Sequence, residues 1–263
     1  MNDLLAALLL GIIEGITEFL PISSTGHLLI AQYWLGARSD LFNVVIQAGA
    51  ILAVVLIYRA RIWQLLRRWR EPEQADYLGK LAAAFAVTAV LGLAVAQAGF
   101  QLPETVTPIA WALVIGGLWM MAAERLAERR PESSRITWTV ALLVGLAQVV
   151  AGVFPGTSRS AATIFVAMLA GTRNRGAATE FAFLVGIPTM FAASGYELVR
   201  YYHAGGGDED WSSFGVAFLA STFTAFVAVK WLLGYIRTHR FTAFAWYRIG
   251  LGVALLLGLP AGA

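Results

Sequence analysis

The sequence GIIEGITEFLPISSTGH, residues 11–27, has a counterpart in GLAQVVAGVFPGTSRS, residues 145–160. The two stretches align without a gap, so that their prolines coincide and Ser24 falls on Ser158. Each is an apolar run that carries a carboxylate or an amide, is interrupted by Pro and continues with hydroxyl residues. A repeat with polar residues at such a break is typical of membrane proteins that build a site at mid-bilayer from two discontinuous helices.

The composition places the chain in a membrane. Of its 263 residues, 59% are hydrophobic and 13% are charged, whereas a soluble domain has about half and a quarter. The chain has no Cys, which excludes disulfides and thiolate metal sites. Its net charge of +3 comes from Arg-rich connecting segments, which report membrane topology and do not indicate nucleic-acid binding.

Six apolar stretches are long enough to cross a bilayer, given roughly 20 residues per crossing. They are residues 41–58, 81–98, 107–126, 180–202, 213–235 and 246–262. Regions 4–36 and 138–171 are too long for one crossing and too short for two, and each has a Pro-Ser break in its middle. We predict that each is a re-entrant pair of half-helices, which enters and leaves on the same side.

The charges of the connecting segments orient these elements. Lys and Arg gather in four of them, which the positive-inside rule places in the cytoplasm: 59–80, 127–137, 172–179 and 236–245. Two further segments contain no Lys or Arg and are predicted to face the periplasm: 99–106 and 203–212. Region 138–171 then enters from the cytoplasm and region 4–36 from the periplasm.

The predicted fold is therefore an all-α integral membrane protein with one membrane domain, residues 1–263. A first repeat, 4–126, consists of the hairpin 4–36 and three spans. A second repeat of opposite orientation, 138–262, consists of the hairpin 138–171 and three spans. In such an inverted-topology repeat, six transmembrane helices surround two hairpins whose tips meet near mid-membrane.

Two carboxylates lie in the first hairpin. Glu14 and Glu18 are spaced i, i+4 and share one helix face inside an apolar segment. Carboxylates at membrane depth are costly and usually face a polar cavity. The pair suits a divalent cation, Mg²⁺ or Ca²⁺, or else one metal ligand and one general acid or base. The alternative is a carboxylate that is hydrogen-bonded for structural reasons only.

The residues after the first break begin the second half-helix. Ser23, Ser24 and Thr25 offer hydroxyls and free N–H groups, and a helix N-terminus in a cavity attracts anions. Ser23 can equally be a simple helix cap. His27, one turn after Ser24, is predicted to act as its base, with Ser24 as the preferred nucleophile. A nucleophilic His27 and direct attack by water stay open.

The second break supplies a cation. Arg159 in mid-membrane needs a partner, and its fork of donors matches phosphate oxygens. Gly156 allows close backbone approach. Further candidate substrate-binding groups are Thr157, Ser158, Ser160 and Thr163, although Thr163 can instead bond its own helix backbone. The combined set fits metal-assisted phosphoryl or pyrophosphoryl chemistry. Outside the motifs, Glu180 and Arg248 are expected to snorkel from cytoplasmic helix ends.

Both motifs, residues 14–27 and 155–163, resemble the two signature motifs of the undecaprenyl-diphosphatase family, also called bacitracin-resistance proteins. The resemblance covers the whole chain in length, motif spacing and number of spans. It implies an inner-membrane enzyme that hydrolyses undecaprenyl diphosphate to undecaprenyl phosphate and inorganic phosphate, with a divalent cation. The product is a lipid carrier that is reused for peptidoglycan and other envelope glycans. Seven positions match residues associated with activity: Glu14, Glu18, Ser24, His27, Ser158, Arg159 and Thr163.

A transporter or flippase of polyprenyl phosphates is the alternative, since inverted repeats with broken helices are also a transporter architecture. Transport does not need a hydroxyl nucleophile beside a His and a carboxylate pair, whereas hydrolysis does. The expected location is the bacterial inner membrane, with several crossings and a site that opens to the periplasm. The expected partners are the lipid diphosphate and membrane lipids; the oligomeric state stays open, with a homodimer as one option.

Overall fold

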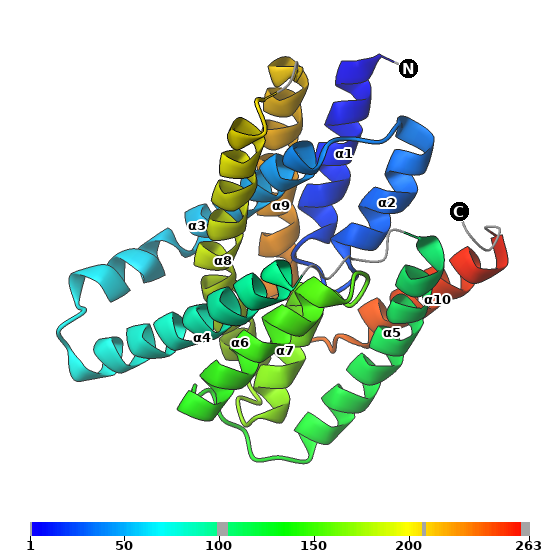
Figure 1. Cartoon of the computed structure of the whole chain (residues 1–263). Coiled ribbons are helices and arrows are strands. Elements are labelled where there is room, and N and C mark those ends of the chain that lie inside the picture. Colours follow the sequence, from blue (N-terminus) through cyan, green and yellow to red (C-terminus); the bar gives the residue numbers. More distant parts are fainter. Residues whose placement is uncertain (1, 99–104, 207–208, 259–263) are drawn as a thin grey trace.

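The chain forms a bundle of helices (Figure 1). The computed structural model describes residues 2–98, 105–206 and 209–258, and within these ranges it contains helices and no strand. The helices, in chain order, are α1 Asp3–Thr17, α2 Ser24–Leu35, α3 Asp40–Arg67, α4 Pro72–Gln97, α5 Val106–Glu128, α6 Trp138–Val153, α7 Arg159–Leu169, α8 Arg175–His203, α9 Trp211–Tyr235 and α10 Thr242–Gly258. The predicted all-α class is confirmed.

Helix lengths divide the bundle into two sets. Helices α3, α4, α5, α8 and α9 have 23 to 29 residues and are long and apolar enough to cross a membrane, as the composition predicts. Helices α1, α2, α6 and α7 have 11 to 16 residues, which is less than a crossing requires. Helix α10, predicted as a sixth crossing over residues 246–262, has 17 residues, and the end of that range lies outside the described residues.

Local sequence signals set where the helices begin. Side chains of Asn2, Ser39, Thr137 and Asn174 each accept a hydrogen bond from a backbone N–H in the first turn of the helix that follows. Such caps satisfy N–H groups that have no partner within the helix. These four helices are α1, α3, α6 and α8, so polar residues in the connecting segments start the helices of both halves of the chain.

The helices pair in a reciprocal pattern. Helix α1 packs on α9, and α6 packs on α4; α3 packs on α8, and α5 packs on α10. The pattern is symmetric under exchange of each helix with the helix five places away in the chain. The exchange turns the pair α1–α9 into α6–α4 and leaves the pairs α3–α8 and α5–α10 unchanged. Glycines permit the first two contacts, because a Cβ at Gly11 would lie 2.3 Å from the Ala217 carbonyl oxygen and one at Gly145 would lie 2.6 Å from that of Ala84.

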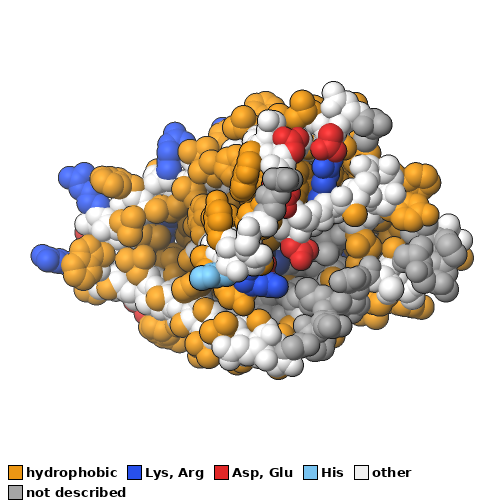
Figure 2. Space-filling model, turned by 45° about the horizontal axis from the view of Figure 1, so that its top comes forward, with side chains coloured by type: hydrophobic (Ala, Val, Ile, Leu, Met, Phe, Trp, Pro, Cys, Tyr) orange, Lys and Arg blue, Asp and Glu red, His pale blue; other side chains and the backbone are white. Residues whose placement is uncertain are grey.

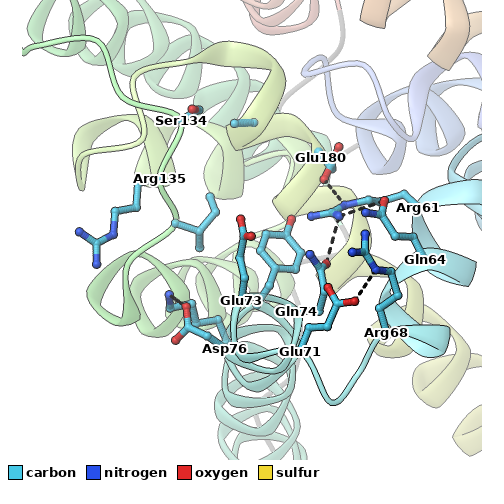
Figure 3. A pocket seen from close by; sticks show the side chains of 14 residues that line it. Arg61, Gln64, Arg68, Glu71, Glu73, Gln74, Asp76, Ser134, Arg135 and Glu180 are labelled. Atoms are coloured by element: carbon cyan, nitrogen blue, oxygen red, sulfur yellow. Dashed lines mark hydrogen bonds and ion pairs between the residues drawn. The ribbon is translucent and has the colours of Figure 1, made fainter.

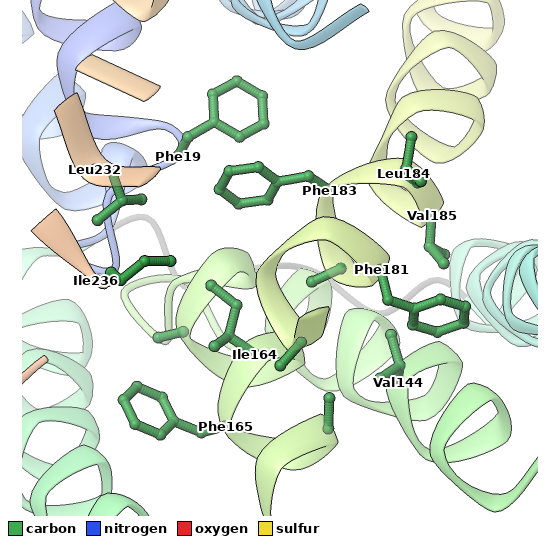
Figure 4. Packing of buried hydrophobic residues seen from close by; sticks show 14 of the residues in the cluster. Phe19, Val144, Ile164, Phe165, Phe181, Phe183, Leu184, Val185, Leu232 and Ile236 are labelled. Carbon is green, nitrogen blue, oxygen red and sulfur yellow. The ribbon is translucent and has the colours of Figure 1, made fainter. Parts of the chain in front are cut away.

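The main hydrophobic core surrounds the second hairpin. Ile164 and Phe165 of α7 are fully buried. Figure 4 shows Ile164 between α8 and the side chains of Leu232 and Ile236. Phe19, from the break of the first hairpin, meets Phe183 of α8 edge to face, with ring centroids 5.1 Å apart. Helix α7 is therefore held on several sides, while α2 lies at the outer edge of the bundle (Figure 1).

Ion pairs mark the two ends of the bundle. At one end, Arg38 pairs with Asp3 across 2.7 Å. Figure 2 shows the face at that end, with acidic and basic side chains near its middle and hydrophobic side chains around them. At the opposite end, Arg61 pairs with Glu180 across 3.0 Å and Arg175 with Glu124 across 2.8 Å.

Candidate active site at the two helix breaks

The two helix breaks share an unusual backbone geometry. Ser23 precedes α2 with φ 73°, and Ser158 precedes α7 with φ 70°; they are the non-glycine residues with positive φ in the described chain. The Ser23 hydroxyl accepts from the N–H of Gly26 across 3.4 Å, and that of Ser158 from the N–H of Ala161 across 3.3 Å. The gapless alignment, which paired Ser24 with Ser158, is thus one residue out of register: Ser158 corresponds to Ser23.

Three predicted residues meet between the breaks. Ser24 Oγ donates a hydrogen bond to Glu18 Oε2, and Arg159 Nη2 donates to Glu18 Oε1 and forms an ion pair with it. The Glu18 side chain is 4% exposed and that of Arg159 is 28% exposed. The carboxylate is therefore buried, while the guanidinium remains accessible to an anion.

Glu14 lies one turn before Glu18 on α1 and is fully buried. Neither of its carboxylate oxygens has a hydrogen-bond partner within the described residues. A buried carboxylate without a partner is costly, which is the signature of a group that another species completes. The nearby carboxyl of Glu18 can share a proton with Glu14, so the structural alternative, a hydrogen-bonded Glu14, stays open.

The donor set suits a hard cation only in part. Within the described ranges, no three His, Cys, Asp or Glu side chains lie close enough together to hold a metal. Mg²⁺, however, is commonly held by one or two carboxylates together with phosphate oxygens of the substrate and water. Glu14 and Glu18 therefore fit a cation that is bound jointly with a phosphorylated substrate.

His27 has different neighbours from those predicted. Its Nδ1 lies 2.7 Å from the backbone oxygen of Ser23, and its Nε2 lies 2.7 Å from the hydroxyl of Tyr247. The two rings are stacked, with an interplanar angle of 5°. Both ring nitrogens are thus engaged away from the Ser24 hydroxyl, which instead contacts Glu18. The role of His27 as a base stays a prediction, and Tyr247 is a contact that the sequence did not reveal.

The second break packs tightly against α5. Gly156 has φ 91°, and a Cβ there would lie 2.9 Å from the Ile109 carbonyl oxygen. Ser158 Oγ and Ser160 Oγ lie 3.1 Å apart, and Ser160 Oγ donates to the Leu20 carbonyl across 3.1 Å. Ser160 therefore links the two breaks.

The other predicted hydroxyls differ in accessibility. Thr163 is buried and donates to the carbonyls of Arg159 and Ser160 in its own helix, at 2.8 and 3.2 Å. Thr163 therefore bonds the backbone of its own helix, which was the alternative to a role in substrate binding. Thr25 is exposed and Thr157 is partly exposed, so both can be reached from outside the packed core.

Arg248 is the main residue whose position the sequence reasoning missed. Snorkelling was expected, but the side chain is 0% exposed. It donates to the carbonyls of Pro21 in the first break, at 3.5 Å, and Gly156 in the second, at 2.8 Å. An Arg inside an apolar span was the available signal, because a charge at membrane depth usually faces the protein interior.

A separate cavity of about 840 Å³ lies at the end of the bundle that carries Glu180 (Figure 3). None of the motif residues lines it. Its charged groups are largely paired with one another: Arg61 with Glu180, Arg68 with Glu71 and Lys80 with Asp76. Glu180, which was expected to snorkel, is partly exposed at this end of the bundle and pairs with Arg61. The cavity is distinct from the candidate active site.

Comparison with known proteins gives a single consistent family. The family described as "Bacitracin resistance protein BacA" matches residues 7–254. A protein of Rhizobium etli named undecaprenyl-diphosphatase is 67% identical over 260 residues, covering 98% of both chains. A protein of Xanthomonas oryzae pv. oryzae with the same name is 64% identical over 264 residues, covering 100% of both. With a match over nearly its whole length, this chain belongs to the bacitracin resistance protein family.

Proposed function

We infer that this protein is an undecaprenyl-diphosphatase, which hydrolyses undecaprenyl diphosphate to undecaprenyl phosphate and inorganic phosphate. The names of the full-length relatives support this activity. The observation that carries it in the structure is the contact of Ser24 and Arg159, from two different hairpins, with one buried carboxylate, Glu18. The activity returns the lipid carrier to cell-wall synthesis and accounts for resistance to bacitracin.

Ser24 is the nucleophile in the mechanism that we propose. Its Oγ attacks the terminal phosphorus, its proton passes to Glu18 Oε2, and undecaprenyl phosphate leaves. The leaving undecaprenyl phosphate takes that proton from Glu18, which becomes a carboxylate again. Water then hydrolyses the phosphoserine: Glu18 removes a proton from the water and returns it to Ser24 Oγ as inorganic phosphate is released. The contact between Ser24 and Glu18 favours this carboxylate as the base over His27.

Arg159 has two roles in succession. Without substrate its guanidinium forms an ion pair with Glu18. A diphosphate that binds the accessible guanidinium in bidentate fashion competes for the same donors. Substrate binding therefore releases Glu18 to accept the Ser24 proton, and Arg159 offsets the charge on the phosphoryl group.

A divalent cation, Mg²⁺ or Ca²⁺, is the proposed cofactor. Glu14 and Glu18 would hold it, and the two oxygens of Glu14, which have no hydrogen-bond donor within the described residues, support this assignment. When bound, the cation supplies positive charge that polarises the phosphoryl oxygens. The chain's own part is to bury the two carboxylates one turn apart, Glu14 in α1 and Glu18 directly after its last residue.

The proposed topology is the inverted repeat, with six crossings, the two hairpins and a site that opens to the periplasm of the inner membrane. The reciprocal pairs α1–α9 and α6–α4 support it. Cysteines introduced singly into this Cys-free chain test it with an impermeant thiol reagent on intact cells. We expect labelling at Gly206 and none at Ser134, and the reverse result would overturn the orientation.

Phosphate release from a prenyl diphosphate by the purified protein tests the function itself. We expect hydrolysis that excess EDTA abolishes and added Mg²⁺ or Ca²⁺ restores. Hydrolysis that persists in EDTA would remove the metal from the mechanism. Translocation of a polyprenyl phosphate across vesicles without phosphate release would instead favour the transporter alternative, for which the named relatives give no support.

A further inference from the structure

We propose that Arg248 of α10 is a positioning residue that holds the two helix breaks at a fixed separation. This proposal rests on the inferred hydrolase activity only for its kinetic test. Glu18 and Ser24 come from the first hairpin and Arg159 comes from the second. Their contact therefore depends on whatever fixes one break against the other.

The contacts of Arg248 reach both breaks at once. Its guanidinium donates to the carbonyls of Pro21 at 3.5 Å, Gly156 at 2.8 Å and Ala112 at 3.1 Å. The first two acceptors belong to the breaks and the third to α5. A planar fork of donors can bridge three acceptors in fixed geometry, which an ammonium cannot do. One side chain thus ties both breaks to the neighbouring helix.

The burial of Arg248 is too unfavourable for a residue whose role is only to fill space. Arg248 is 0% exposed, its Nε has no hydrogen-bond partner, and its acceptors in the described chain are backbone carbonyls without a carboxylate. A buried charge without a counter-ion destabilises the fold, and an apolar residue of the same volume avoids that cost. A feature that costs stability and bridges two parts of a reactive site is typical of functional constraint.

The packing around Arg248 is built to admit it. A Cβ on Gly116 of α5 would lie 2.2 Å from Nη2 of Arg248. The change Gly116→Ala therefore displaces the guanidinium without altering its charge. Gly250, two residues along α10 from Arg248, has open space where a Cβ would be added, so Gly250→Ala is a matched control for an added methyl group.

The test measures the separation of the breaks directly. Ile16 and Phe154 flank the two breaks and are 42% and 56% exposed. Spin labels on cysteines at these positions report one distance in the Cys-free chain. We expect a narrow distance distribution in the parent and in Gly250→Ala, and a shifted or broadened one in Arg248→Gln and Gly116→Ala.

Kinetics of the unlabelled variants give the second readout. A misplacement of about 1 Å can cost about 100-fold in rate, so we expect kcat to fall by about that factor in Arg248→Gln and Gly116→Ala, with a smaller change in KM. Arg248→Lys keeps the charge but reaches fewer acceptors, so its kcat should be intermediate between those of the two variants and that of the parent. Arg248→Lys and Gly116→Ala keep the test available if Arg248→Gln does not fold.

Two results would overturn the proposal: normal kcat in Gly116→Ala and Arg248→Gln, or lost activity with an unchanged distance distribution. The second would assign Arg248 an electrostatic role toward the substrate. If the parent does not hydrolyse the lipid diphosphate, the proposed function fails, but the distance measurement still tests the role of Arg248.

Discussion

The two hairpins have the same backbone design and different surroundings. In α7, eight of eleven residues are buried, whereas in α2 three of twelve are. Helix α7 packs on α5, α6 and α8, while α2 contacts α1 and α5. At the position after the capping serine, the first hairpin has Ser24 and the second has Arg159. The buried hairpin therefore supplies the guanidinium of Arg159, and the hairpin at the edge of the bundle supplies the hydroxyl of Ser24, the proposed nucleophile.

The residues that precede the two breaks also differ in charge. Glu14 in α1 has no hydrogen-bond partner in the described chain, whereas its aligned counterpart in α6, Gln148, donates to the Thr88 hydroxyl across 3.0 Å. The amide of Gln148 is satisfied on its nitrogen, although its oxygen has no partner within the described residues. Both oxygens of Glu14 lack one, and a buried carboxylate costs more than a buried amide oxygen unless a cation or a proton joins it. The two hairpins thus share a backbone design but differ in charge, and substitutions in the two breaks should have different effects.

Glu18→Gln should have the largest effect. The amide keeps the shape of the carboxylate but cannot remove the Ser24 proton, and loss of a general base typically costs about 100- to 10 000-fold in rate. Phosphate release by the folded variant measures the loss. Glu132→Gln, at an exposed carboxylate outside both breaks, is the matched control, and parent-like turnover of the Glu18 variant would remove this residue from the mechanism.

Arg159→Lys tests the second break. The substitution keeps the charge but loses the bidentate fork, so we expect kcat/KM to fall by about 100-fold. Steady-state kinetics with a prenyl diphosphate measure it. Normal kinetics in the Lys variant would reduce Arg159 to a counter-ion for Glu18.

His27→Gln separates the two candidate bases. Since both ring nitrogens contact groups other than Ser24, the rate should fall by less than about 100-fold, below the usual worth of a general base. Tyr247→Phe, which removes the other side of one of these contacts, should have an effect of similar size. A loss as large as that of Glu18→Gln would restore His27 as the base.

The capping serines should show the smallest and most equal effects. Ser23→Ala and Ser158→Ala each lose a helix cap at a position with positive φ, which should lower stability by about 1 kcal/mol. Ser→Gly at either position should lower it less, because glycine adopts positive φ without strain. Thermal unfolding in detergent measures both pairs, and a large difference between the two positions would contradict the structural equivalence of Ser23 and Ser158.

Much of this arrangement is readable from the sequence, because apolar length, proline breaks and loop charge act locally. They predict the bounds of both hairpins: 4–36 against α1 and α2, and 138–171 against α6 and α7. The motif residues that meet at Glu18 were also predicted. Which atoms touch was not predictable, since the Ser24–Glu18 contact and the burial of Arg248 depend on how distant helices pack. The one-residue register shift was hidden by a serine that follows each proline closely.

The most direct measurement is a rapid acid quench of the enzyme with substrate labelled on its terminal phosphate. If Ser24 attacks phosphorus, an acid-stable phosphoryl adduct should accumulate on the peptide that contains Ser24, and Ser24→Ala should lose it. An acid-labile, base-stable adduct would assign the attack to His27. The absence of any adduct, with inversion at phosphorus in a single turnover, would contradict the account and indicate direct attack by water.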